Sequence, residues 1–236
     1  MDSLSGKVAY ITGGSKGIGL GVARELVKQG MRVAVSGRGA EDLDKAVAEL
    51  GAENAMGIIS DVTRLEDEQS AVEKVIKRWG TLDVVVANAG VGHFAPIDTL
   101  KHEAWHQMIN TNLNGVYHTL MAAMDALKAS KGYYITIASL AGTNFFAQGA
   151  GYNATKFGVV GFTQAAMLDL RPYGIKVSTI MPGSVSTHFN NHSPSSKDAW
   201  KIQPEDIGHL VRDLLQMHPR TLPSKIEVRP TRPDLK

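Results

Sequence analysis

The sequence predicts an α/β fold in which one doubly wound parallel sheet of about seven strands carries helices on both faces. Short apolar runs alternate with helix-length amphipathic segments along the whole 236 residues. Some runs, such as Val-Val-Val-Ala at 84–87, are apolar throughout, which is typical of strands covered on both faces. Because strand–helix alternation implies right-handed crossovers, the strands are expected to be parallel.

Each apolar run is assigned to a strand and each amphipathic segment to a helix. No low-complexity linker, internal repeat or shift in composition divides the chain, so residues 1–236 are expected to form a single domain. The expected strands are residues 7–12, 32–36, 55–59, 82–87, 132–138, 175–181 and 225–229. The expected helices are residues 17–29, 41–50, 65–79, 102–127, 152–171 and 204–217.

Composition excludes several classes of function. The net charge of +2 is too small to indicate nucleic acid or a membrane surface as a partner. The chain has no cysteine, which excludes disulfides, thiolate catalysis and cysteine-ligated zinc. The N-terminus has no apolar signal-like region, and no stretch approaches the length of a membrane span. A soluble cytoplasmic protein is therefore expected.

Glycine and polar residues follow six of the expected strands. In open α/β sheets, ligands bind outside the carboxyl ends of the strands, which meet at one edge. The six loops are therefore expected to converge on one rim. The residues that follow the strands are, in chain order, Gly13, Gly37-Arg38, Asp61, Asn88-Ala89-Gly90, Ser139 and Pro182-Gly183.

The first of these loops predicts a phosphate-binding site. Its glycines have the spacing G-x-x-x-G-x-G, which departs from the G-x-G-x-x-G fingerprint. The physics is the same, because glycines let the backbone approach a pyrophosphate and a helix N-terminus offers free N–H groups. A plain tight turn would need fewer glycines. The candidate residues are Gly13, Ser15, Lys16, Gly17, Ile18 and Gly19.

The end of the second expected strand favours NADP(H) as the cofactor. An acidic residue here would bind a free adenosine ribose 2′-hydroxyl, whereas an arginine accommodates a 2′-phosphate. The chain has Arg38, with Lys16 as a second cation, and a guanidinium matches phosphate oxygens well. Glu41 and Asp42 are the nearest acids, and they are expected in the first turn of the next helix.

Tyr152 and Lys156 are four residues apart and therefore lie on one face of their expected helix. Moving a tyrosine pKa from about 10 toward 7 takes roughly 4 kcal/mol. A cation about 4 Å away supplies roughly that much at an effective dielectric of about 20. Lys156 is thus expected to lower the pKa of Tyr152. The alternative is an ordinary surface pair.

The combined set of motifs resembles the short-chain dehydrogenase/reductase family over essentially the whole chain. The matching residues are the glycine loop, Asp61-Val62, Asn88-Ala89-Gly90, Asn112, Ser139, Tyr152-x-x-x-Lys156 and Pro182-Gly183, and Ser139 lies 13 residues before Tyr152 as that family has it. The sequence departs from the family at Ala87, where a second asparagine is common, and the segment after Thr187 and the C-terminal tail are short. The resemblance implies a Rossmann-type fold.

This resemblance implies hydride transfer between nicotinamide C4 and a carbonyl or carbinol carbon. Tyr152 would donate a proton to the carbonyl oxygen, and Ser139 would stabilise the charge on the same oxygen. Lys156 would also hold the nicotinamide ribose. The backbone carbonyl of Asn112 would position a water that relays protons to the lysine.

The resemblance also assigns cofactor contacts along the rim. Asp61 and Val62 correspond to adenine contacts. Residues 182–187 would line the nicotinamide, with Thr187 on its carboxamide. The further cofactor residues carried over in this way are Asn88, Ala89, Gly90, Tyr152, Lys156, Pro182, Gly183 and Val185.

Substrate and oligomer predictions depend on the loops and the long helices. Aromatic side chains on loops at the rim and in a short substrate lid near 187–202 favour an apolar pocket for a ketone or aldehyde, although exposed lid residues or subunit contacts would explain them too. In the family that the chain resembles, the helices carrying Asn112 and Tyr152 pack between subunits, so a homodimer or homotetramer is expected. The candidate substrate residues are Phe94, Phe145, Phe146 and Phe189.

The H-E-x-x-H pattern formed by His102, Glu103 and His106 matches a zinc-protease template. A third ligand is needed, and only His118 has a near spacing, so no metal is expected. The leading hypothesis is an NADPH-dependent carbonyl reductase acting on a small molecule, including 3-oxoacyl-type substrates. Two alternatives stay open, an NAD-dependent alcohol dehydrogenase of the same family and a non-catalytic NADP-sensing binding protein.

Overall fold

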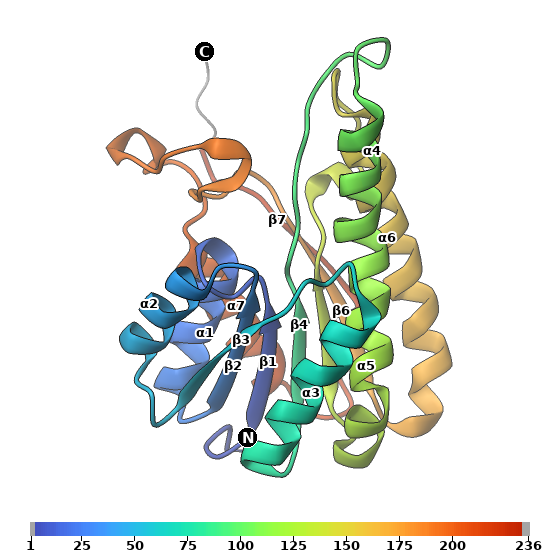
Figure 1. Ribbon diagram of the computed structural model, residues 1–236. Helices are drawn as coiled ribbons and strands as arrows, with labels where there is room; N and C mark the ends of the chain where they lie inside the picture. Colours follow the sequence, from blue (N-terminus) through green and yellow to red (C-terminus); the bar gives the residue numbers. More distant parts are fainter. Residues whose placement is uncertain (1–2, 233–236) are drawn as a thin grey trace.

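The computed structural model describes residues 3–232 and contains one sheet of seven parallel strands in the order β3-β2-β1-β4-β5-β6-β7 (Figure 1). The predicted fold class is therefore confirmed. The strand order reverses between β1 and β4, which places a crevice at the carboxyl ends of these two strands. The strands are β1 Val8–Thr12, β2 Arg32–Gly37, β3 Ala55–Ile59, β4 Val84–Ala87, β5 Tyr133–Ile137, β6 Lys176–Pro182 and β7 Lys225–Val228.

Two helical layers cover the sheet. Helices α1, α2 and α7 pack on one face, and α3, α5 and α6 pack on the other (Figure 1). The helices are α1 Gly17–Lys28, α2 Ala40–Leu50, α3 Leu65–Trp79, α4 His102–Met108, α5 Gly115–Ser130, α6 Ala150–Leu170 and α7 Pro204–Gln216. The remaining helical segments are the π-helical η1 Ile109–Asn114 and the short 3-10 helices η2 Leu140–Gly142, η3 Arg171–Tyr173, η4 Phe189–Asn191 and η5 Ser196–Asp198.

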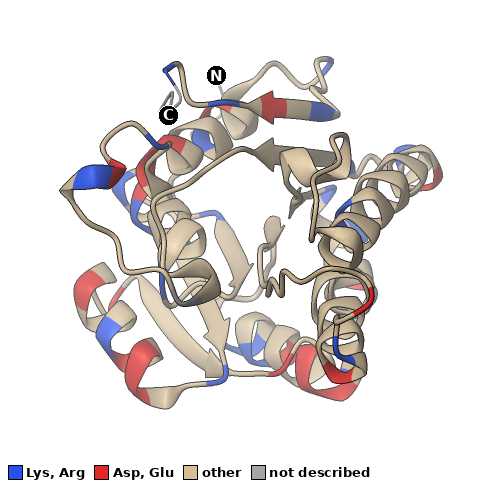
Figure 2. Ribbon diagram, turned by 90° about the horizontal axis from the view of Figure 1, so that it is seen from above, with Lys and Arg blue, Asp and Glu red and all other residues tan. Residues whose placement is uncertain are grey.

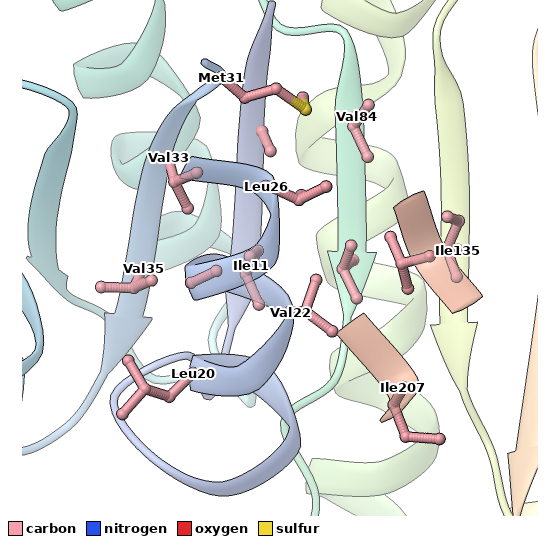
Figure 3. Close-up of a cluster of buried hydrophobic side chains, with 14 of the residues drawn as sticks. Ile11, Leu20, Val22, Leu26, Met31, Val33, Val35, Val84, Ile135 and Ile207 are labelled. Atoms are coloured by element: carbon pink, nitrogen blue, oxygen red, sulfur yellow. The ribbon is translucent and has the colours of Figure 1, made fainter. Parts of the chain in front are cut away.

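The apolar stripe of α1 fixes this helix on the sheet. Val22 and Leu26 are fully buried and point toward strand residues such as Ile11 and Val84 (Figure 3). Burying a side chain of this size contributes about 1.5–3 kcal/mol. The glycine loop lies between β1 and this helix, so its position follows from the packing of both.

Helices α1 and α7 approach each other at backbone distance. A Cβ built on Gly21 of α1 would lie 2.5 Å from the carbonyl oxygen of Pro204. A Cβ built on Gly208 of α7 would lie 2.6 Å from the carbonyl oxygen of Gly21. Larger residues at these two glycines would push the helices apart, which makes α7 a close support for the helix that follows the glycine loop.

The helix predicted over residues 102–127 is divided by a π-helical segment. α4 ends at Met108, the π segment η1 covers Ile109–Asn114, and α5 begins at Gly115. A π turn contains one residue more than an α turn, and such segments occur frequently at functional sites. Periodicity alone predicted a continuous helix, because a single extra residue scarcely changes the apolar pattern.

Charged residues lie mainly on the outer helices and loops when the molecule is viewed from above (Figure 2). Among residues 3–232, no helix combines the length and the apolarity that a membrane crossing needs.

Candidate active site

The glycine loop has the backbone geometry of a phosphate cradle. Gly13 and Gly17 have φ values of +62° and +58°, which favour glycine. A Cβ on Gly19 would lie 2.6 Å from the carbonyl oxygen of Gly13, so the loop closes on itself at backbone distance. Among the described residues, no side chain caps the N-terminus of α1, and its first turn contains no acid. The N–H groups at this helix start therefore fit a pyrophosphate.

Asn88 and Thr12 join the carboxyl ends of β1 and β4. The Asn88 side-chain amide donates to the carbonyl oxygens of Thr12 (2.9 Å) and Gly13 (3.0 Å). The Thr12 hydroxyl accepts from the backbone N–H groups of Asn88 (3.0 Å) and Ala89 (3.1 Å). Thr12 is not among the residues predicted from the sequence, although a threonine directly before a glycine loop is a signal that could have indicated it. These bonds fix the shape of the cradle from the neighbouring strand.

Arg38 lies beside the glycine loop at the end of β2. Gly14 N–H donates to the Ser36 carbonyl at 3.0 Å, which brings the loop against this strand end. Arg38 is exposed and has no hydrogen-bond or ion-pair partner within residues 3–232. Lys16 forms an exposed ion pair of 3.5 Å with Asp42, which lies in the first turn of α2 as expected. Of these two cations, Arg38 is the more available for a 2′-phosphate.

Asp61 and Val62 follow β3, where adenine contacts were expected. The Asp61 carboxylate accepts from the Thr63 N–H at 3.0 Å, so one of its oxygens serves its own turn. Val62 is mostly buried, and a Cβ built on Gly115 of α5 would lie 2.7 Å from its side chain. His118 of α5 bonds the Val62 carbonyl at 2.9 Å. The Val62 side chain thus packs mainly on α5, and the adenine contact expected of this loop stays a prediction.

Tyr152, Lys156 and Ser139 come together where α6 crosses the end of β5. Lys156 is 5% exposed, and its Nζ donates to the Ile137 carbonyl at 3.0 Å. The same Nζ lies 5.7 Å from the centre of the Tyr152 ring. Ser139 follows β5 and caps η2, because its hydroxyl accepts from the Ala141 N–H at 3.1 Å. The structure therefore places all three predicted side chains at one point.

Burial shifts the pKa values of both Tyr152 and Lys156, and burial is not encoded in the Tyr-x-x-x-Lys spacing. It raises the pKa of Tyr152 to about 12, while the polar contact with the Ser139 hydroxyl acts in the opposite direction. Burial also lowers the pKa of Lys156 to about 8. The expectation that Lys156 lowers the pKa of Tyr152 is not met in this structure, because burial is the largest cause of the pKa shift of both groups.

Asn112 lies in the π segment, and its side chain is fully engaged. Its Oδ1 accepts from the Val91 N–H at 2.8 Å. Its Nδ2 donates to the Val91 carbonyl (2.8 Å) and the Thr155 hydroxyl (3.1 Å). A Cβ built on Gly90 would lie 3.4 Å from Asn112 Oδ1 and 3.8 Å from Lys156 Nζ. Any direct role of Asn112 in proton transfer therefore belongs to its backbone carbonyl, as the resemblance implied.

The loop after β6 closes over the glycine loop. Val185 forms a bridge with Ile202, and the Ser186 N–H donates to the Ile202 carbonyl at 2.9 Å. A Cβ built on Gly17 would lie 3.4 Å from the side chain of Thr187. Pro182 accepts a long hydrogen bond of 3.5 Å from the Ser139 hydroxyl. These contacts bring residues 182–187 to the crevice between the phosphate cradle and the tyrosine.

Three of the four candidate substrate residues form one aromatic cluster, in which Phe94 and Phe189 contact Tyr152 and Phe146 contacts Phe94. The Phe94 ring lies 5.4 Å from the Tyr152 ring, 5.7 Å from Phe146 and 6.5 Å from Phe189. The Phe189 ring also lies 5.8 Å from Tyr152. Phe145 does not join them, because it is 83% exposed and stacks on Phe157 of α6. The aromatic cluster therefore consists of Phe94, Phe146 and Phe189.

His102 and His106 contact each other on the exposed face of α4, with 2.8 Å between their Nε2 atoms. Within the described part of the chain, no group of three or more His, Cys, Asp or Glu side chains is arranged to hold a metal ion.

The family model described as short chain dehydrogenase matches residues 7–198. A trans-4-hydroxycyclohexanecarboxylate dehydrogenase of Sinomonas cyclohexanicum is 36% identical over 195 residues, which are 79% of this chain and 75% of that protein.

Solved structures of similar proteins hold either nicotinamide cofactor. An alcohol dehydrogenase from the archaeon Thermococcus sibiricus, complexed with 5-hydroxy-NADP, is 32% identical with a TM-score of 0.90 and coverage of 97% of this chain and 99% of that chain. A 3-ketoacyl-(acyl-carrier-protein) reductase from Brucella melitensis, complexed with NADH, is 26% identical with a TM-score of 0.89 and the same coverage.

Proposed function

The chain belongs to the short-chain dehydrogenase/reductase family of oxidoreductases, and from this premise we propose that it reduces an apolar ketone or aldehyde to an alcohol with NADPH. The observation that carries the proposal is the meeting of Ser139, Tyr152 and Lys156 beside the phosphate cradle. A hydroxyl, a phenol and a cation grouped in this way can transfer a proton to an oxygen atom that gains negative charge.

The protonation of Tyr152 favours the reductive direction. With a pKa of about 12, its phenol carries a proton at neutral pH, which is the form that a donor needs. The Ser139 hydroxyl donates to the same carbonyl oxygen and limits the charge that develops there. Lys156 returns the proton to Tyr152, and a water positioned by the backbone carbonyl of Asn112 then returns a proton to Lys156. When bound, NADPH supplies a hydride from its nicotinamide ring.

Arg38 supports NADP(H) over NAD(H). The glycine loop would hold the pyrophosphate, and residues 182–187 would face the nicotinamide. Arg38 would bind the 2′-phosphate, because its guanidinium is exposed at the rim and unpaired among residues 3–232. Lys16 contributes less, since Asp42 already neutralises part of its charge. The NAD-dependent alternative would leave Arg38 without a ligand.

The aromatic cluster supports an apolar substrate. Phe94 contacts the Tyr152 ring edge-to-face and Phe189 contacts it at a tilt, while Phe146 packs on Phe94. Together the three rings form a wall suited to hydrocarbon or aromatic groups. Phe189 belongs to the proposed lid of residues 187–202, so a substrate would be enclosed between this lid and the loop that carries Phe94. A ketone with cyclic or aromatic substituents fits these surroundings best.

Self-association through α5 and α6 is part of the proposal. Tyr117 and Met121 of α5 and Phe157 and Leu168 of α6 are exposed large apolar residues. Such residues on neighbouring helices suit contact with a second copy of the chain. Sedimentation would then show a homodimer or homotetramer.

Replacement of Tyr152 by phenylalanine tests the proposed reaction. Tyr152→Phe removes the proton donor and keeps the ring, so NADPH binding, followed by nucleotide fluorescence, is expected to persist while carbonyl reduction is lost. Tyr173→Phe is the control, because Tyr173 lies in η3 beyond the end of α6. A panel of cyclic, aromatic and aliphatic ketones, aldehydes and 3-oxoacyl thioesters supplies the substrates.

Two outcomes would overturn this function. Normal turnover by Tyr152→Phe would exclude the phenol as the donor. Binding of NADPH by the wild type without reduction of any carbonyl in the panel would favour the non-catalytic NADP-sensing protein.

A further inference from the structure

Helix α3 carries a carboxyl group that is entirely buried. Glu68 is 0% exposed and lies in the core between the sheet and the layer of α3, α5 and α6. Within residues 3–232, no lysine, arginine or histidine forms an ion pair with it. Burying a carboxyl without a cation is unfavourable unless hydrogen bonds compensate. The hydrogen bonds of Glu68 therefore explain how it is accommodated.

Three hydroxyl groups from different elements donate to Glu68. Its Oε1 accepts from the Tyr10 phenol at 2.9 Å and from the Ser60 hydroxyl at 2.6 Å. Its Oε2 accepts from the Thr119 hydroxyl of α5 at 2.8 Å. The Tyr10 oxygen also lies 3.0 Å from the Ser36 hydroxyl. All five side chains are buried, and they form one connected network, which we call the Glu68 network.

The Glu68 network lies directly behind the residues proposed to contact the adenosine half of the cofactor. Ser36 lies on β2, two residues before Arg38, which follows the end of that strand. Ser60 is the residue before Asp61, and its N–H donates to the Gly37 carbonyl at 3.1 Å, which joins the two strand ends. The ends of β2 and β3 are thus held to one carboxyl group from α3.

A purely structural purpose would be served better by apolar residues. Well-packed hydrophobic side chains in place of a buried polar cluster are often neutral or stabilising. Hydrogen bonds differ from apolar contacts because they fix direction as well as distance. Directional hydrogen bonds beneath a binding rim would hold the loops above them in defined positions.

We propose that Glu68 is a positioning residue for the adenosine half of NADPH, acting through Ser36 and Ser60. It holds the ends of β2 and β3 in the relative position that lets Arg38 and Asp61 face the same nucleotide. The inference rests on the proposed use of NADPH. Within residues 3–232, the Thr119 hydroxyl bonds only Glu68 Oε2 and the Gly115 carbonyl of its own helix, so an effect of Thr119 on the nucleotide is expected to pass through Glu68.

Two isosteric threonine variants test this role. Thr119→Val removes a hydroxyl from the network, and Thr163→Val is the matched control. Thr163 is also a fully buried helix threonine, its hydroxyl lies 2.7 Å from the Val159 carbonyl one turn earlier, and it has one side-chain partner, Thr136, at 3.0 Å. The corresponding distance from the Thr119 hydroxyl to the Gly115 carbonyl is 2.8 Å. The two variants therefore lose similar local bonds.

The affinities for two nucleotides are compared. Thr119→Val is expected to raise the Kd for NADPH, measured by nucleotide fluorescence, about fivefold to tenfold. The Kd for 2′-phospho-ADP-ribose, which lacks nicotinamide, is expected to rise by the same factor, with kcat at saturating NADPH within about twofold of the wild type. Thr163→Val is expected to leave both Kd values unchanged. Combining Thr119→Val with Ser60→Ala is expected to weaken binding less than the product of the single effects, because both act on Glu68.

Distinct results would overturn the two proposals. The positioning role alone is overturned if Thr119→Val and Thr163→Val have the same Kd for NADPH. It is also overturned if Thr119→Val weakens the binding of NADPH but not that of 2′-phospho-ADP-ribose. Failure of the wild type to bind NADPH overturns the proposed function and this inference with it.

Discussion

Replacing Lys156 by methionine tests which of the two buried groups gives up its proton first. The Lys156 Nζ lies 5.7 Å from the centre of the Tyr152 ring. A cation at that distance would stabilise a phenolate by roughly 3 kcal/mol at an effective dielectric of about 20, or about two pKa units. This stabilisation exists only while the lysine is charged. Its pKa of about 8 lies below the value of about 12 for Tyr152, so the lysine deprotonates first.

We therefore expect Lys156→Met to leave the ionisation of Tyr152 nearly unchanged in the protein without nucleotide. The measurement is the ultraviolet absorbance of phenolate during a pH titration, with Tyr152→Phe as the reference that subtracts the other tyrosines. At about pH 10, only about 1% of Tyr152 should be ionised in either protein.

A different titration would refute this reasoning. If Tyr152 were half ionised in the wild type near pH 9 and the midpoint rose by about two pH units in Lys156→Met, the lysine would be charged and would control the phenol.

Three further changes have defined outcomes. Because the wild type carries a buried charge at Lys156 below pH 8, Lys156→Met should have a free energy of unfolding in urea about 3 kcal/mol higher at pH 7. The difference should vanish near pH 10.5, where lysine loses its proton in the unfolded chain too, and a difference independent of pH would contradict the lowered pKa of Lys156. Arg38→Asp should raise the Kd for NADPH about 10- to 100-fold and leave the Kd for NADH unchanged, whereas Arg32→Asp at the other end of β2 should change neither Kd. An unchanged ratio of the two Kd values in Arg38→Asp would remove the case for NADP(H). Asn88→Ala leaves the carbonyl oxygens of Thr12 and Gly13 without their side-chain donor, so the free energy of unfolding in urea should fall by about 2–3 kcal/mol. An unchanged free energy of unfolding would show that solvent replaces the amide.

The fold and the convergence of the strand ends could be predicted because both follow from periodicity. Once the strands are parallel, residues such as Gly13, Arg38 and Ser139 must lie at one rim, wherever they are in the chain. The predicted strand boundaries agree with the structure to within two residues at each end. The roles given to the individual side chains remain predictions.

Features that depend on packing could not be predicted in this way. Phe145 and Phe146 are adjacent in the sequence, yet loop geometry stacks Phe145 on Phe157 of α6 and packs Phe146 on Phe94 of the aromatic cluster. The order of proton loss from Tyr152 and Lys156 depends on burial, which a motif does not contain. Glu68 has the sequence context of an ordinary helix acid, and only the tertiary structure surrounds it with hydroxyl groups.

The π segment sets the rotation of α4 relative to α5. Each residue of an α-helix turns the chain by about 100°, so deleting one residue from Ile109–Asn114 would restore regular α geometry and rotate one helix by that amount. α5 would keep Gly115 against Val62, while Met108 would swing away from Gly151, the residue before Tyr152. The extra residue thus lets one continuous helical segment pack on Val62 at the end of β3 along one part and on Gly151 of α6 along the other. A homologue one residue shorter here would need a different chain path to keep both contacts.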